Sequence, residues 1–84
     1  MSILIEGADL VRIHYLDQVE DLSNIDSKGR EERLNRVFSI LFENNQIVQE
    51  VIIDGFVFKE NYEPVLLQRM GEIKEVHIVT LQGE

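Results

Sequence analysis

Residues 47–58 read IVQEVIIDGFVF, two apolar runs on either side of the pair Asp54-Gly55. The longer run, 47–53, is rich in β-branched residues, which favour strands. Aspartate followed by glycine tolerates the positive φ angles of a type I′ turn, a common two-residue connection between antiparallel strands. The stretch therefore predicts a β-hairpin with strands at 47–53 and 56–58, and the other elements can be placed around it.

An amphipathic helix is predicted before this hairpin. Apolar residues recur there at the i, i+3, i+4, i+7 and i+8 spacing that places them on one face of a helix. They are Leu34, Val37, Phe38, Leu41 and Phe42. Asp26 or Ser27 can cap the helix by accepting backbone N–H groups of its first turn, and Asn44-Asn45 can end it. We expect a helix of about four turns.

A short helix and a last strand are predicted after the hairpin. Asn61 can cap the helix, which carries the apolar residues of 62–70, and Gly71 stands where a left-handed residue often ends a helix. Residues 73–81 then have the period-2 pattern of a strand, with Val76 and Ile78 on one face.

The beginning of the chain predicts a second hairpin. Residues 3–5 are a short apolar run, and 10–16 alternate apolar and polar side chains in the manner of a half-buried strand. Gly7 and Asp9 mark a turn between the two runs. Residues 17–27 are polar and acidic, and they predict a loop.

The resulting order, β-β-α-β-β-α-β, predicts an α+β fold of the β-grasp (ubiquitin-like) type. In that arrangement the first and last strands pair in parallel at the sheet centre and one long helix covers one face. The alternative merges the first two strands into one and gives the ferredoxin-like order β-α-β-β-α-β. The break at Gly7-Ala8-Asp9 favours the β-grasp arrangement.

The second half of the chain resembles a known family. The stretch 47–58, together with NYEPVLL at 61–67 and EVHIVT at 75–80, is similar to the amino-terminal domain of uncharacterised bacterial proteins. In those proteins a β-grasp-like unit precedes a helical region. The resemblance implies a β-grasp fold and assigns no activity and no functional residues.

Size and composition exclude several classes of function. The 84 residues have room for one domain, 1–84, which we expect to be a module of a longer chain, at its N-terminus. The absence of cysteine removes disulfides, thiolate catalysis and iron–sulfur clusters, and we predict no cofactor. A net charge of −8 disfavours nucleic acid and anionic membranes as partners. Without a signal peptide pattern, a cytoplasmic location is expected.

The predicted sheet suggests a protein contact site. Both of its long strands, 47–53 and 73–81, are apolar on both faces, whereas the long helix can cover only one face. Contiguous apolar surface on a soluble domain usually marks a contact site. The candidate residues of this uncovered face are Leu4, Val48, Ile52, Val79 and Leu81. The partner predicted is a protein: a second copy, the remainder of a longer chain, or another protein.

A second candidate contact patch lies on the long helix. Arg33 and Arg36 flank its apolar stripe, with Ile40 beside them, on a domain that is otherwise acidic. The alternative is an ordinary solvated edge of the helix. A third hypothesis is an acidic surface that binds a basic protein, which strong salt dependence would reveal.

The two histidines give the alternative function. If the first and last strands are neighbours, His14 and His77 can lie on one sheet face with Glu50 or Glu75 nearby, as in a small-ligand or metal-binding regulatory domain. The simpler interpretation is that both are solvent-facing strand residues, and it leaves the chain without a metal site. No nucleophile with a base is identifiable, so we predict a non-enzymatic interaction module without catalytic residues.

Overall fold

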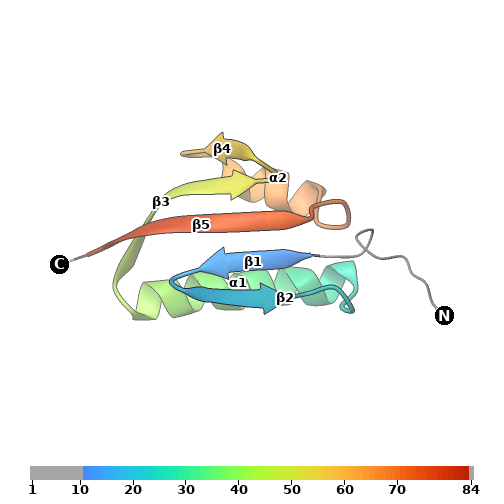
Figure 1. The fold of residues 1–84 in the computed structure, drawn as a ribbon, viewed down its shortest axis with the longest axis horizontal. Coiled ribbons are helices and arrows are strands. Elements are labelled where there is room, and N and C mark those ends of the chain that lie inside the picture. Colours follow the sequence, from blue (N-terminus) through green and yellow to red (C-terminus); the bar gives the residue numbers. More distant parts are fainter. Residues whose placement is uncertain (1–10, 84) are drawn as a thin grey trace.

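The computed structural model describes residues 11–83 and has an α+β fold, a five-stranded mixed sheet packed against two helices (Figure 1). The α+β prediction is confirmed. In chain order the elements are β1 (Arg12–Tyr15), β2 (Gln18–Asp21), α1 (Ser27–Glu43), β3 (Gln46–Ile53), β4 (Phe56–Phe58), α2 (Tyr62–Gln68) and β5 (Glu75–Gln82). No helix within residues 11–83 is long and apolar enough to cross a membrane.

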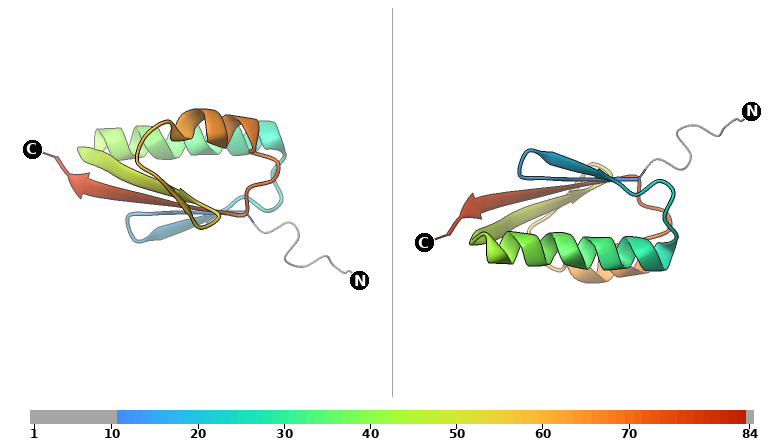
Figure 2. Two further views of the ribbon diagram at one scale, coloured as in Figure 1. Left: turned by 90° about the horizontal axis from the view of Figure 1, so that it is seen from above. Right: turned by 90° about the horizontal axis from the view of Figure 1, so that it is seen from below.

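The strands lie in the order β2-β1-β5-β3-β4. The central neighbours β1 and β5 are parallel, and the other neighbouring pairs are antiparallel. Both helices lie on the same side of the sheet (Figure 2). We call that side the helix face and the opposite side the open face, because no helix of residues 11–83 covers it.

The core lies between the helix face and α1. Alternate residues of the three central strands are buried there, because successive side chains of a strand point to opposite faces. They are Ile13, Tyr15, Val51, Ile53, Val76 and Ile78. The helical stripe is confirmed at Leu34, Val37 and Leu41, which are all buried. Phe42 is 83% exposed instead, because eight residues of helix turn it about 80° away from Leu34.

The turn between β3 and β4 has the predicted conformation. Asp54 and Gly55 both have positive φ, 49° and 91°. At the start of α1 the cap is Asp26, whose carboxylate accepts a hydrogen bond from the Gly29 N–H at 2.8 Å. The left-handed Asn45, at φ 59°, follows the end of α1.

Two predictions about α2 are wrong. Asn61 occupies the N-cap position, but its left-handed backbone leaves the side chain without a capping hydrogen bond. Gly71 does not have positive φ. The helix ends at Gln68 and Arg69 is its C-cap, so Gly71 lies beyond the position where a left-handed glycine would end it.

The first hairpin within residues 11–83 joins the strand predicted at 10–16 to a strand that follows it. Its strands are β1 and β2, joined by Leu16 and Asp17, so the loop predicted at 17–27 contains a strand. Within residues 11–83, β2 is an edge strand that pairs only with β1, and its four residues are exposed or half-buried. The strand predicted at 3–5 lies outside the described residues. Two strands before α1 do not agree with the ferredoxin-like alternative, which has one.

Candidate functional site on the open sheet face

One row of side chains crosses all five strands on the open face. The strand register aligns Val19, His14, His77, Ile52 and Val57, each opposite the next on the neighbouring strand. Residues paired in this way point to the same side of a sheet. The two histidines are at the centre of the row. Val19 and Val57, at its ends, are 56% and 54% exposed.

More aliphatic side chains follow along the two longest strands. Val79 lies two residues beyond His77 on β5, and Leu81 two residues further. Opposite Leu81 on β3 is Ile47. Leu81 and Ile47 are 54% and 55% exposed. Together with the row these residues make the open-face apolar group, which consists of Val19, Ile47, Ile52, Val57, Val79 and Leu81.

A bulge in β3 changes the face to which Val48 belongs. The register with β5 pairs Glu50 with Val79 and Val48 with Thr80, so Gln49 is an extra residue without a partner of its own. One extra residue reverses the alternation of faces on the far side of the bulge. Val48 therefore lies on the helix face, partly buried against the core, and its predicted place on the open face is wrong.

Three of the other candidates are found on the open face, and one cannot be placed. Ile52, Val79 and Leu81 lie on that face, as the sequence predicts, whereas Leu4 lies outside the described residues. Sequence reasoning missed Val57, although the two-residue turn at Asp54-Gly55 already implies its pairing with Ile52. Ile47 could not have been found by alternation, because the bulge lies between it and Ile52.

The three candidates on α1 lie on one side of the helix and differ in their contacts. Arg33 Nη1 contacts Glu20 Oε1 of β2 at 2.9 Å, and Ile40 is partly buried against the core. Arg36 is exposed. The Glu20 carboxylate also accepts a hydrogen bond from the Tyr15 hydroxyl at 3.1 Å. This contact ties β1, β2 and α1 together, so we assign Arg33 a structural role.

Two titratable groups near β2 have shifted pKa values. Burial raises the pKa of Tyr15 above 10.0, and the hydrogen bond to Glu20 raises it further. The Asp21 carboxylate accepts hydrogen bonds from the Ser23 hydroxyl and, at 2.9 Å, from the Ser23 backbone N–H. These bonds lower the pKa of Asp21 below 3.8, because they favour its charged form.

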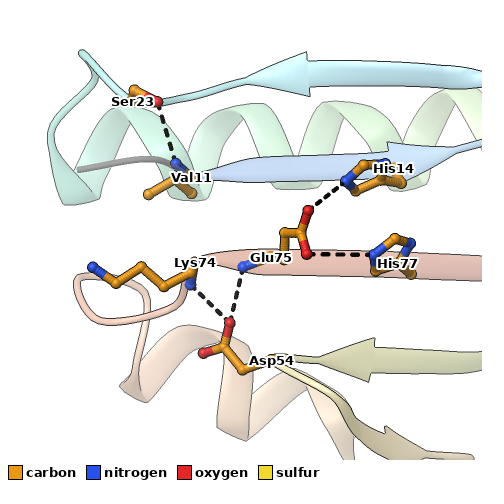
Figure 3. A network of polar contacts seen from close by, with 7 residues as sticks. All are labelled: Val11, His14, Ser23, Asp54, Lys74, Glu75 and His77. Atoms are coloured by element: carbon orange, nitrogen blue, oxygen red, sulfur yellow. Dashed lines mark hydrogen bonds and ion pairs between the residues drawn. The ribbon is translucent and has the colours of Figure 1, made fainter. Parts of the chain in front are cut away.

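The centre of the open face brings two histidines and a carboxylate together (Figure 3). His14 and His77 are register partners on the parallel strands β1 and β5, with ring centroids 4.0 Å apart and ring planes 9° from parallel. Glu75, two residues before His77 on β5, places its carboxylate beside the stacked rings (Figure 3). Its Oε2 is 3.1 Å from His14 Nε2, and its Oε1 is 3.7 Å from His77 Nε2. The carboxylate thus contacts both imidazoles.

The backbone of Glu75 is itself held in place. Asp54 Oδ1 accepts hydrogen bonds from the backbone N–H groups of Lys74 at 3.0 Å and of Glu75 at 2.9 Å (Figure 3). The Asp54 carboxylate therefore fixes the first residue of β5. An open depression at this end of the face is lined by residues that include Arg12, Ile52 and His77.

Comparison of the chain with protein-family models, curated proteins and solved structures gives no match. The candidate function therefore rests on the geometry of the open face. That face combines aliphatic side chains, suited to contact with another apolar surface, with a central imidazole–carboxylate cluster.

Proposed function

We propose that the chain is a β-grasp domain that binds a partner protein through its open sheet face, without catalysis. The order β2-β1-β5-β3-β4 with a parallel central pair supports the β-grasp assignment. The observation that carries the function is the open-face apolar group. A sheet with one solvated face usually has polar side chains on that face, whereas this one has six aliphatic residues among its polar ones.

The exposure of these residues supports a contact role. Val19, Ile47, Val57 and Leu81 are each more than half exposed, and Val79 is 37% exposed. Burying apolar surface contributes about 25 cal/mol per Å², so a partner that covers this group gains a favourable hydrophobic term. Ile52, near the middle of the face, is the residue on which we expect binding to depend most.

The negative charge of the chain indicates which kind of protein can bind the open face. The open face has an excess of negative charge, with the carboxylates of Asp21, Glu50 and Glu75 and one arginine, Arg12, and the whole chain carries −8. Two copies brought face to face would place these charges against each other. We therefore propose a different protein as the partner, one with an apolar surface bordered by lysine and arginine. The acidic groups then accelerate association and favour correct pairing.

The test compares three single variants of the chain as bait for proteins of its native source. Ile52→Asp and Val79→Asp place a charge on the open face. Phe42→Asp is the matched control, because Phe42 is 83% exposed on α1, across the sheet. Circular dichroism first establishes that each variant is folded. An unfolded Ile52→Asp chain would mean that Ile52 is a core residue, which contradicts the proposal.

The proposal is supported if a protein binds the wild type and Phe42→Asp but neither open-face variant. The purified pair should then form a complex whose affinity falls as salt is added, because charged rims are screened. Equal retention by all three variants contradicts the proposed site. Sedimentation of the chain alone provides the second check, since a dimer that Ile52→Asp dissociates would identify a second copy as the occupant.

A further inference from the structure

We propose that His14, Glu75 and His77 form a binding site for a divalent transition-metal ion of the zinc type. The three side chains come from the two central strands of the sheet and face the same way. One ligand atom from each, two imidazole nitrogens and a carboxylate oxygen, all lie within 4.8 Å of one another. The site lies at the centre of the open face, and its test uses the chain alone, without a partner protein.

The distances suit a shared ion. Zinc binds imidazole nitrogen and carboxylate oxygen at about 2.1 Å, so two ligand atoms at a tetrahedral angle lie about 3.4 Å apart. Each histidine nitrogen is near this distance from one oxygen of the Glu75 carboxylate, His14 at 3.1 Å from Oε2 and His77 at 3.7 Å from Oε1. The imidazole rings are stacked with nearly parallel planes, so both must rotate about their side-chain torsions to aim their nitrogens at one ion.

The donor set determines the class of metal. Imidazole nitrogen suits zinc, copper, iron and nickel, whereas calcium and magnesium prefer sites made only of oxygen. A metal-bound nitrogen must be free of its proton, and neutral imidazole can carry that proton on Nδ1 instead of Nε2. Three protein ligands leave at least one further coordination position for water or an added ligand.

The position of the site in the fold favours binding. Hydrogen-bonded strands hold the backbone of His14 beside that of His77, and Asp54 fixes the backbone of Glu75. Residues that orient metal ligands in this way contribute to affinity. The side chains of His14, Glu75 and His77 are 28%, 45% and 43% exposed, so an ion can reach them from solvent.

The experiment is a titration of the chain with Zn²⁺ by calorimetry, repeated with Co²⁺ by absorbance and with Mg²⁺ as a negative control. We expect one Zn²⁺ per chain, a Co²⁺ spectrum of low coordination number, and no Mg²⁺ binding. Histidine NMR signals should show that both imidazoles change together. His14→Ala, His77→Ala and Glu75→Gln should each lower the Zn²⁺ affinity by at least about tenfold.

Glu50→Gln is the matched control for Glu75→Gln. Both substitutions remove one negative charge from the same sheet face, but Glu50 lies opposite Val79 and outside the cluster. The Glu50→Gln chain should bind Zn²⁺ with unchanged affinity. The proposal fails if the two variants weaken Zn²⁺ binding equally, if a histidine variant binds like the wild type, or if the wild type shows no saturable binding. Circular dichroism without metal establishes that each variant is folded.

Discussion

Asp54 and Glu75 are joined by two hydrogen bonds that run in opposite directions. Asp54 Oδ1 accepts from the Glu75 backbone N–H at 2.9 Å, and the Asp54 backbone N–H donates to the Glu75 carbonyl, also at 2.9 Å. One residue of the β3–β4 turn thereby fixes the beginning of β5. The same carboxylate accepts a second hydrogen bond, from the Lys74 backbone N–H, and the backbone of Asp54 has φ at 49°.

Replacing Asp54 should show how much its hydrogen bonds to β5 stabilise the fold. Asp54→Ala removes two accepted hydrogen bonds and places alanine in the left-handed region, so we expect a loss of about 1–3 kcal/mol in the free energy of unfolding. Asp54→Asn keeps a carbonyl oxygen and tolerates positive φ, so its loss should be less than half as large. Urea unfolding measures both variants. Equal losses would show that the side-chain acceptor contributes little.

The bulge in β3 predicts opposite behaviour of two neighbouring residues. Val48 packs against the core, so Val48→Asp should lower the free energy of unfolding by about 1–3 kcal/mol. Ile47 is 55% exposed on the open face, and Ile47→Asp should cost less than about 0.5 kcal/mol. Denaturant unfolding of the two variants measures both losses in the free energy of unfolding. A larger loss for Ile47→Asp would contradict the register of β3 and β5.

Tyr15 should make stability depend on pH in alkaline solution. Its pKa is raised above 10.0 in the folded chain, so the folded state keeps the proton over a range in which the unfolded state has lost it. The stabilisation is complete below pH 10.0 and is lost as the pH rises through the folded pKa. Urea unfolding between neutral and alkaline pH should show this decline.

The matched variants for this experiment are the two tyrosine-to-phenylalanine changes, since the chain has 2 tyrosines. Tyr15→Phe should reduce the loss of stability at alkaline pH. Tyr62→Phe should retain the loss that is due to Tyr15. Spectrophotometric titration of the Tyr62→Phe chain should place the remaining tyrosine above the ordinary pKa. A normal titration there would contradict the burial and the Glu20 hydrogen bond.

Ser23 should control the titration of Asp21. Ser23→Ala removes the hydroxyl donor and leaves the backbone N–H, so the pKa of Asp21 should rise part of the way toward 3.8. The wild-type contribution of this carboxylate to stability is complete above that ordinary value and is lost as the pH falls through the lowered pKa. NMR titration of the Asp21 side chain measures the change. Ser39→Ala, at an exposed position of α1, should leave it unaltered.

Short-range patterns allowed much of the fold to be predicted. The helical spacing of Leu34, Val37 and Leu41 predicts α1, because one buried stripe requires that period. The pair Asp54-Gly55 predicts the turn that pairs β3 with β4, because few residue pairs tolerate two positive φ angles. These features depend on residues close in sequence, and the structure places them as predicted.

Edge strand β2 gave no such signal. Its residues Gln18–Asp21 are polar or exposed, and edge strands need little apolar alternation because one side of their backbone faces solvent. Its identity as a strand comes from pairing with β1.

The sequence by itself determined the helix, the β3–β4 turn and the apolar character of the long strands, because each follows from local period and backbone preference. Only the tertiary structure decided the register of the strands and the faces to which Ile47 and Val48 belong. Gln49 reverses the alternation in β3 through its pairing with β5. The register of β1 with β5 brings His14 beside His77 across 62 intervening residues. Register between strands far apart in the chain depends on how their apolar faces pack together, and a slip of one residue would reverse every side chain.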